Sequence, residues 1–234
     1  MPRKKLLIAS TSTVYGGQYL DYLTDEMTDF FSGIDTVLFI PYARPSGISH
    51  DEYTETAQRG FSKIDKKIMG IHTFDNPKEA IGNAQAIFTG GGNTFLLIKQ
   101  LYEFDLIDVL RKTVLNGTPY MGTSAGSNIA GQTIQTTNDM PIVYPPSFEA
   151  LKLLPFNLNP HYLDPIPELR HMGETRETRI KEFHSQNDIP VVGLREGSWL
   201  RLQNEQIILK GNLTARIFEA EKEPYELEAG KIIL

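Results

Sequence analysis

Residues 116–131 read NGTPYMGTSAGSNIAG, and this stretch predicts a strand, a sharp turn and a helix in succession. Residues 119–121 are typical of the end of a buried strand, and residues 128–130 are a candidate helix start. Between them, residues 122–126 fit G-x-S-x-G, the pattern that exposes a serine hydroxyl at a strand-to-helix turn in several hydrolases. The same pattern also arises by chance in ordinary turns. The rest of the chain must therefore decide whether Ser124 is a nucleophile.

Short apolar runs alternate with segments of helical periodicity through the first half of the chain. The runs are typical of buried strands at residues 6–9, 36–40, 68–72, 86–89 and 119–121. Apolar spacing or cap signals predict helices at residues 18–31, 51–62, from 77 onward, 94–102 and 106–115. This alternation is typical of an α/β fold with a mostly parallel sheet and helices on both faces.

Polar or glycine-rich segments follow several of the predicted strands. They are residues 10–17, residues 41–50, residues 90–93 and the turn at Ser124. In a parallel α/β sheet the carboxyl ends of the strands lie at one edge, and active sites form beyond that edge. The sequence therefore predicts that these segments meet on one rim of the sheet.

The pattern changes in the second half of the chain, where polar and proline-rich segments interrupt the alternation. We expect a strand at residues 156–159, a loop at 162–173, a helix at 174–184 and a strand at 189–194. From residue 198 to residue 234, short β-like runs separated by turn signals predict a C-terminal antiparallel meander. Because the chain has no repeat or linker, we expect one domain over residues 1–234.

Composition excludes several classes of function. The 234 residues are 40% apolar and 22% charged, as in an ordinary globular domain. A net charge of −6 without a basic block argues against nucleic acid or an anionic membrane as the partner. The absence of cysteine excludes disulfides, thiolate metal sites and a cysteine nucleophile. Because the apolar runs are too short for a signal peptide or a membrane span, we expect a cytoplasmic protein.

A serine nucleophile needs a base, usually histidine, and the chain has five histidines. His161 directly follows the predicted strand at residues 156–159, so it falls on the rim where Ser124 is expected. The others lie in a predicted strand, near a helix end or in polar loops, where structural or solvated roles are more typical: His72, His184, His50 and His171. His161 is therefore the favoured base.

Two carboxylates are candidates to orient that base. Asp139 lies in a polar loop, and Glu196 lies in the turn after the strand at residues 189–194. Each could also be a solvated or capping residue, and the sequence leaves the choice open. The spacing argues against the usual α/β-hydrolase esterase, in which histidine follows the acid near the end of the chain, because only 37 residues separate Ser124 from His161. Here a long meander follows His161 and both acids.

The segment Gly90–Asn93 has a glycine run that fits neither the dinucleotide fingerprint nor the phosphate-binding loop. Glycines at a strand end can instead bring backbone N–H groups close to a developing oxyanion, next to the N–H of Ala125. A tight turn that only requires glycine is the alternative.

Six blocks of sequence together resemble the peptidase E family, serine peptidases whose fold is related to class I glutamine amidotransferases. The blocks are GGGNTF (90–95), GTSAGSN (122–128), TTNDMPIV (136–143), NPH (159–161), GETRE (173–177) and LREGSW (194–199). They occur in the family's order and are spread over about half of the chain, from residue 90 to residue 199. The resemblance implies hydrolysis of Asp-X dipeptides through an acyl-enzyme, without a metal. We expect no other cofactor, and a monomer or homodimer whose partner is a small peptide.

The resemblance also implies roles for individual residues. Ser124 matches the nucleophile and His161 its base, while Asp139 and Glu196 match two acids that the family picture places in or near the triad. Arg176 matches an arginine for the aspartate side chain of the substrate. The residues that match the oxyanion hole are Gly91, Gly92, Asn93 and Ala125.

One position departs from the family pattern, because Thr123 stands where the family's elbow carries tryptophan. We expect this change to affect the lining of the pocket more than the chemistry. Two other functions stay open: a cyanophycinase-like or other serine hydrolase on the same scaffold, and a catalytically silent binding protein.

Overall fold

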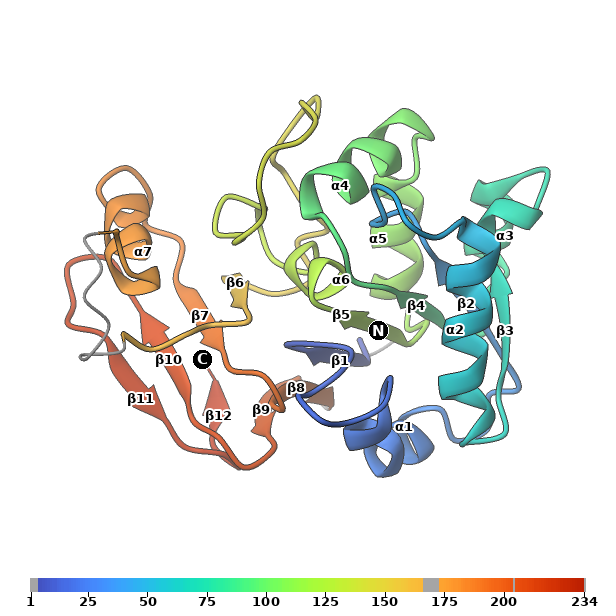
Figure 1. Ribbon diagram of the computed structural model, residues 1–234, viewed down its shortest axis with the longest axis horizontal. Coiled ribbons are helices and arrows are strands. Elements are labelled where there is room, and N and C mark those ends of the chain that lie inside the picture. Colours follow the sequence, from blue (N-terminus) through green and yellow to red (C-terminus); the bar gives the residue numbers. More distant parts are fainter. Residues whose placement is uncertain (1–3, 166–172, 204, 234) are drawn as a thin grey trace.

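The computed structural model describes residues 4–165, 173–203 and 205–233 (Figure 1). The strands are β1 (Leu6–Ala9), β2 (Thr36–Ile40), β3 (Lys67–Gly70), β4 (Ile87–Thr89), β5 (Tyr120–Thr123), β6 (Asn157–Pro160), β7 (Val191–Leu194), β8 (Trp199–Gln203), β9 (Gln206–Lys210), β10 (Ala215–Phe218), β11 (Tyr225–Leu227) and β12 (Ile232–Ile233). The helices are α1 (Thr24–Phe30), α2 (His50–Ser62), α3 (Pro77–Gly82), α4 (Thr94–Glu103), α5 (Ile107–Leu115), α6 (Ala125–Asn128) and α7 (Arg176–His184).

The larger sheet has eight strands in the order β12-β9-β8-β1-β5-β4-β2-β3. Strands β1, β5, β4, β2 and β3 run parallel to one another, whereas the pairs β1–β8, β8–β9 and β9–β12 are antiparallel. The predicted α/β fold with a mostly parallel sheet is therefore confirmed. Its antiparallel edge is built from the C-terminal part of the chain.

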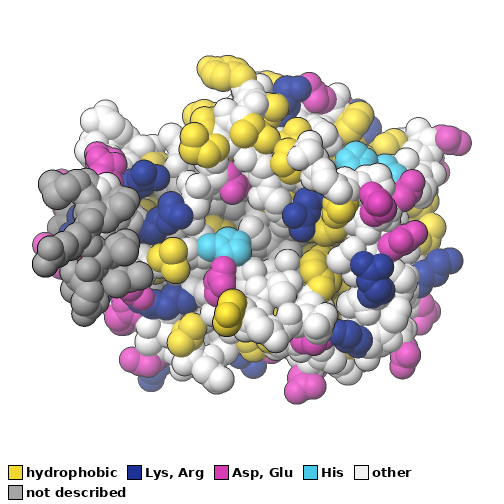
Figure 2. Space-filling view, viewed as in Figure 1, with side chains coloured by type: hydrophobic (Ala, Val, Ile, Leu, Met, Phe, Trp, Pro, Cys, Tyr) yellow, Lys and Arg dark blue, Asp and Glu magenta, His cyan; other side chains and the backbone are white. Residues whose placement is uncertain are grey.

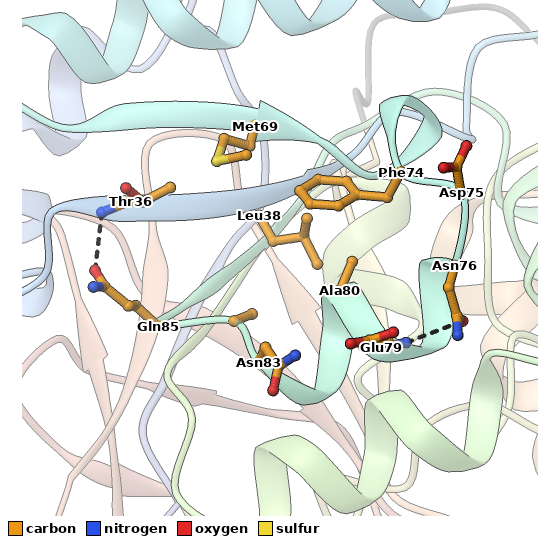
Figure 3. A pocket seen from close by; sticks show the side chains of 11 residues that line it. Thr36, Leu38, Met69, Phe74, Asp75, Asn76, Glu79, Ala80, Asn83 and Gln85 are labelled. Atoms are coloured by element: carbon orange, nitrogen blue, oxygen red, sulfur yellow. Dashed lines mark hydrogen bonds between the residues drawn. The ribbon is translucent and has the colours of Figure 1, made fainter.

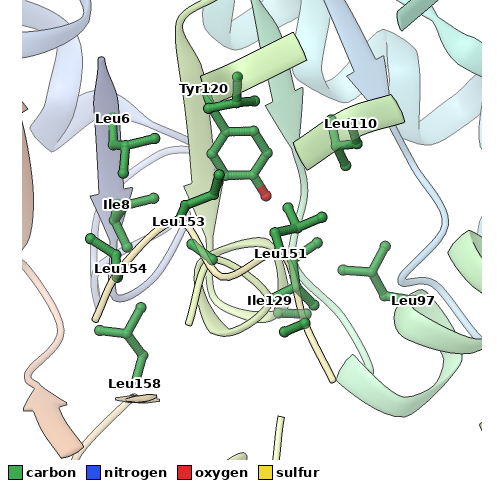
Figure 4. Packing of buried hydrophobic residues seen from close by; sticks show 14 of the residues in the cluster. Leu6, Ile8, Leu97, Leu110, Tyr120, Ile129, Leu151, Leu153, Leu154 and Leu158 are labelled. Atoms are coloured by element: carbon green, nitrogen blue, oxygen red, sulfur yellow. The ribbon is translucent and has the colours of Figure 1, made fainter. Parts of the chain in front are cut away.

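Helices cover both faces of the parallel strands, as the sequence predicts. Along β1, Leu6 and Ile8 pack into the core that contains residues of α3, α4 and α5. The alternate residues Leu7 and Ala9 pack on the opposite face with α1 and α2. This division follows from the alternation of side chains in a strand, and all four side chains are fully buried. Figure 4 shows part of the first core, with Leu6 and Ile8 pointing to the same side.

The smaller sheet has four strands in the order β11-β10-β7-β6. Helix α7 packs on one face of it, where Ile180 contacts a small core with Val191 and Phe218. Its other face continues the large core, because Leu158 of β6 belongs to the same cluster as Leu6. Figure 1 shows this sheet and α7 beside the larger sheet.

The predicted C-terminal meander is wrong in one respect. The strands do follow one another with short turns, but β8 and β9 join the larger sheet, whereas β10 and β11 join β7 in the smaller one. Ala215 pairs with Leu194, so β10 leaves the meander to complete the smaller sheet. Strand spacing and turn residues carry no information on which sheet a strand joins.

Local predictions differ from the structure at several boundaries, including the starts of α7 and β7 and three places earlier in the chain. The strand predicted at residues 68–72 ends at Gly70, and Ile71–Thr73 forms a 3₁₀ turn. The helix predicted at residues 18–31 begins only at Thr24, after another 3₁₀ turn. The helix after the Ser124 turn begins at Ala125 instead of Asn128. Side-chain periodicity predicts which segments are buried better than it predicts where they begin.

The carboxyl ends of the parallel strands meet on one rim. A Cβ atom on Gly91, in the loop after β4, would lie 3.0 Å from the Cβ of Ser124, which follows β5. The Ser124 N–H donates to the carbonyl of Ala9 at the end of β1, at 3.2 Å. Within the described ranges, no helix is long and apolar enough to cross a membrane.

Candidate active site

Ser124 occupies a sharp turn between β5 and α6. Its backbone has φ 51° and ψ −112°, a region that residues with a side chain rarely adopt. The two glycines of the motif allow this turn because the backbone is crowded at both. A Cβ atom on Gly122 would lie 2.4 Å from the carbonyl oxygen of Gly126, and one on Gly126 would lie 2.1 Å from that of Thr89. The turn therefore has the features of a nucleophile elbow.

His161 and Glu196 complete a hydrogen-bonded chain from the serine hydroxyl. The Nε2 atom of His161 lies 2.9 Å from the Oγ of Ser124, and its Nδ1 lies 2.6 Å from the Oε1 of Glu196. An ionised carboxylate can only accept hydrogen bonds, so the proton of the imidazole lies on Nδ1. Nε2 can then accept a hydrogen bond from the serine hydroxyl. His161 also has a positive φ of 55°. Of the two acids that the sequence left open, Glu196 is the one that contacts the histidine.

Asp139 lies at the same site but has other partners. Its Oδ2 accepts the backbone N–H of Thr94 at 2.7 Å and the hydroxyl of Thr137 at 3.2 Å. No hydrogen bond joins it to His161 among the contacts of the described residues. Asp139, Ser124 and His161 nevertheless line one small cavity. Asp139 therefore lines the cavity of Ser124, but in the described structure it does not orient the histidine.

The loop after β4 presents backbone N–H groups next to Ser124. In the described parts of the chain, the N–H groups of Gly91, Gly92 and Ala125 make no hydrogen bond. Gly92 has a φ of 144°, and a Cβ atom there would lie 2.2 Å from the carbonyl oxygen of Ala43, so only glycine fits. Free backbone N–H groups close to a nucleophile are what an oxyanion hole requires.

Asn93 has a different place from the one that the resemblance implies. Its backbone N–H donates to the carbonyl of Ala43 at 2.7 Å, and its side-chain oxygen caps α4 by accepting from Leu96 N at 3.0 Å. Its side-chain NH₂ donates to the carbonyl of Met140 at 2.8 Å. Asn93 therefore holds the glycine loop against its neighbours instead of offering its backbone N–H to a substrate.

Arg176 is the first residue of α7 and lines a cavity of about 270 Å³. This cavity adjoins the one at Ser124, because Thr137 and Asn138 line both. Burial lowers the pKa of the Arg176 guanidinium, Arg179 lowers it further, and Asp139 opposes both effects. The guanidinium stays charged at any ordinary pH, so it places a cation in this cavity, which Glu174 and Glu182 also line. On the face shown in Figure 2, basic, acidic and histidine side chains gather around the hollow between the two sheets.

Thr123 does not line the pocket, contrary to the expectation from sequence. It is fully buried in β5 and pairs with Ala9 of β1. The departure from the family's tryptophan therefore falls inside the sheet, behind the nucleophile.

The other histidines have separate surroundings. His72 lies in the 3₁₀ turn after β3, and its Nε2 is 2.8 Å from Asp51. His50 begins α2 and packs against the rings of Tyr42 and His72. His184 ends α7 and contacts the carbonyl of Ile189 at 3.0 Å, while His171 lies outside the described residues. None of the three described here contacts Ser124.

A cavity of about 570 Å³ lies away from these residues, next to β2, β3 and α3 (Figure 3). Leu38, Met69 and Phe74 line its apolar part, and Gln85 accepts the backbone N–H of Thr36 at 3.0 Å near one end. Its lining includes no nucleophile next to a base. It also contains none of the residues that the sequence indicates for chemistry. Among the described residues, no group of three or more His, Cys, Asp or Glu side chains could hold a metal ion.

Sequence reasoning missed two residues that support the site. Ser10 accepts the backbone N–H of His161 at 2.9 Å, and Tyr53 donates its hydroxyl to the carbonyl of Gly91 at 3.0 Å. Because Ser10 follows a predicted strand, the sequence predicts that it lies on the rim of the sheet, but it does not predict which residue it contacts. Nothing in the helical sequence around Tyr53 indicates the bond to Gly91.

Known proteins resemble this chain over nearly its whole length. Residues 6–210 match the family described as Peptidase family S51. A "probable alpha-aspartyl dipeptidase" of Drosophila melanogaster is 47% identical over 227 residues, which cover 96% of this chain and 93% of that protein. A peptidase E of Streptomyces coelicolor is 46% identical, with 96% of this chain and 91% of that protein covered.

Solved structures share the fold at lower sequence identity. The structure of a peptidase from an acI-B1 actinobacterium has a TM-score of 0.75 at 16% identity, covering 99% of this chain and 96% of that one. A candidate peptidase E protein from Listeria monocytogenes has a TM-score of 0.67 at 21% identity, with coverage of 89% and 98%.

Proposed function

Because the chain belongs to peptidase family S51, we propose that it hydrolyses dipeptides with an N-terminal aspartate through an acyl-enzyme on Ser124. The observation that carries the proposal is the contact of Ser124 Oγ with His161 Nε2 at 2.9 Å, with Glu196 at 2.6 Å from Nδ1. A hydroxyl with a base in reach and a carboxylate behind that base is the arrangement that activates serine for acyl transfer.

The reaction follows from these contacts. His161 Nε2 takes the proton of Ser124 as the oxygen attacks the peptide carbonyl, and Glu196 stabilises the resulting imidazolium. The N–H groups of Gly91, Gly92 and Ala125 stabilise the oxyanion. His161 then donates the proton to the leaving amine. Water attacks the acyl-enzyme with His161 again as base, and the serine hydroxyl is restored.

Substrate selection falls to the charged residues that flank the serine. Arg176 binds the β-carboxylate of the substrate, since a planar guanidinium can donate to both carboxylate oxygens. Asp139 lines the cavity at Ser124 and accepts a hydrogen bond from the free α-amino group of the substrate. Its Oδ2 already binds Thr94 and Thr137, whereas its Oδ1 makes no hydrogen bond to the described residues and can serve the substrate. A substrate with both an amino terminus and an acidic side chain satisfies both groups.

The test is to assay Asp-Leu with Glu-Leu, Ala-Leu and N-acetyl-Asp-Leu, with Ser124→Ala as control. We expect cleavage of Asp-Leu to exceed that of the other three by at least about 100-fold, because each lacks or misplaces a charged contact. The Ser124→Ala variant should be inactive. Equal cleavage of all four peptides, or full activity in the variant, contradicts the proposal.

We extend the proposal to a cytoplasmic enzyme that works without a metal or other cofactor, as a monomer or homodimer. Its partner is a small peptide, as in the dipeptidase that it resembles. Activity should survive dialysis against a chelator. Size-exclusion chromatography with light scattering distinguishes the two assembly states.

A further inference from the structure

Ser10 lies where the two sheets meet. It directly follows β1 and is 0% exposed. Its hydroxyl donates to the carbonyl of Leu194, the last residue of β7, at 2.7 Å. The same oxygen accepts the backbone N–H of His161 at 2.9 Å. A hydroxyl has one proton and two lone pairs, so both bonds form at once without conflict.

The residue before Ser10 holds the other side of the site. The carbonyl of Ala9 accepts the N–H of Ser124 at 3.2 Å and the hydroxyl of Ser127 at 2.6 Å. Ala9, the last residue of β1, therefore contacts the turn at Ser124, and Ser10, the next residue, contacts the turn at His161. No strand of the larger sheet is hydrogen-bonded to a strand of the smaller sheet in the described chain. The distance between Ser124 and His161 thus depends on contacts such as these.

The backbone of His161 needs such support. Pro160 still pairs with Leu194 in the β6–β7 ladder, but His161 turns out of it with φ 55°. A residue with a side chain keeps this conformation only where its surroundings hold it. The bond to Ser10 is the one that its N–H makes within the described structure, and it stands next to the imidazole that contacts Ser124.

We infer that Ser10 is a positioning residue for the proposed peptidase reaction. Its hydroxyl fixes His161 directly. Through Leu194 it also fixes the chain that leads to Glu196 two residues later. The inference rests on the proposed function for its kinetic readout, but the geometry that it concerns is present without substrate.

The test compares Ser10→Ala with Ser198→Ala. Ser198 is also 0% exposed, but among the described residues its hydroxyl has no hydrogen-bond partner, so its variant loses the same atom without losing a bond that the structure shows. For Asp-Leu hydrolysis we expect Ser10→Ala to lower kcat by about 10- to 100-fold with KM within about threefold, because the base is misplaced relative to the serine. Ser198→Ala should stay within about twofold of the unchanged protein in both constants.

A spectroscopic readout separates this inference from the proposed function. The Nδ1 proton of His161, held by Glu196, should give a low-field proton resonance in the protein without substrate. We expect Ser10→Ala to broaden it or move it upfield, and Ser198→Ala to leave it in place. This result supports the inference even if Asp-Leu is not the substrate.

Three results would overturn the inference. They are an unchanged resonance in Ser10→Ala, an unchanged kcat with only a lower Tm, and an equal loss of kcat in Ser198→Ala. If Ser10→Ala does not fold, Ser10→Cys replaces the hydroxyl by a larger thiol that is a weaker donor and acceptor. The kcat of Ser10→Cys should be lower than that of the unchanged protein but still measurable. If Ser10→Cys has the same kcat as the unchanged protein, the inference is overturned as well.

Discussion

Glu196 and Asp139 are two carboxylates at one site with different contacts, and substitution can separate them. Glu196 binds Nδ1 of His161, so Glu196→Gln removes the charge that stabilises the imidazolium. We expect kcat to fall by about 10²- to 10⁴-fold with a small change in KM. Steady-state kinetics with Asp-Leu measures both constants. A Glu196→Gln variant with nearly full kcat would show that the histidine does not need this acid.

Asp139→Asn should have the opposite signature. The amide keeps an oxygen for the N–H of Thr94 but loses the charge that we assign to the α-amino group of the substrate. A hydrogen bond to a charged group is worth about 1.5–3 kcal/mol, so KM should rise by about 10- to 100-fold. The kcat should change much less. If Asp139→Asn instead abolishes kcat at saturating substrate, Asp139 acts in the chemical step.

Tyr53 contacts the glycine loop that we propose as the oxyanion hole. Its fully buried hydroxyl donates to the carbonyl of Gly91. That carbonyl and the N–H of Gly92 belong to one trans peptide, so they point in opposite directions. Holding the carbonyl toward Tyr53 therefore keeps the N–H of Gly92 turned away from Tyr53, as an oxyanion donor requires. The glycine run alone does not determine this orientation.

Tyr53→Phe should consequently lower kcat by about 3- to 30-fold, less than the 10²- to 10³-fold typical for loss of a whole oxyanion donor. Tyr102→Phe is the matched control, because its hydroxyl also donates to a backbone carbonyl, that of Glu149 at 3.0 Å, away from the site. Kinetic constants and Tm of both variants are the measurement. Equal kcat values in the two variants would contradict the role of Tyr53 in the loop.

At the scale of elements, the sequence predicts the site better where the chain is regular. Parallel strands that end in Ser124 and in the Gly90–Asn93 loop can be predicted to share a rim, because their carboxyl ends must coincide. His161 and Glu196 follow β6 and β7 of the smaller sheet. The position of this sheet relative to the larger one depends on packing between residues far apart in the sequence. The sequence could therefore propose both acids but could not choose between them.

The segments that carry His161 and Glu196 are also joined by an ion pair. Arg195 donates to both oxygens of Asp164, from Nε at 2.8 Å and from its terminal nitrogen at 2.6 Å. The hydrogen bond from Arg195 lowers the pKa of Asp164 below its ordinary value of 3.8. The same bond raises the pKa of Arg195. This pair therefore stabilises the folded protein only while Asp164 is ionised.

The sign of the pH dependence follows from the lowered pKa of Asp164. The stabilisation is present above the unfolded pKa of about 3.9, and it is lost as the pH falls through the lower folded pKa. We expect the difference in free energy of unfolding between the unchanged protein and Asp164→Asn to shrink between pH 6 and pH 3. Urea unfolding at both values measures it. A difference that is constant, or that grows toward pH 3, contradicts the pairing.

At the scale of the whole molecule, the large hydrophobic core holds the two sheets together. Leu158 of β6 is fully buried in the cluster that also contains Leu6 of β1 and Tyr120 of β5. The carbonyl of Leu158 accepts bonds from Asn128 at 3.0 Å and Thr136 at 2.8 Å, which tie β6 to the segment after the nucleophile. A shared core of this kind couples the sheets without strand pairing between them, and the site lies along the same junction.

We therefore propose that the chain is a single domain and unfolds as one unit. Leu158→Ala should cost about 2–5 kcal/mol and should weaken both sheets together. In urea, fluorescence of the single tryptophan, Trp199 in β8, should follow the same transition as hydrogen exchange of the amides in β7 and β10. Leu110→Ala, in the same cluster but on α5, is the control and should shift both probes equally. If β7 and β10 lose protection while Trp199 still reports a native larger sheet, the smaller sheet is a separate unit, and its hold on His161 and Glu196 can be lost without unfolding the nucleophile turn.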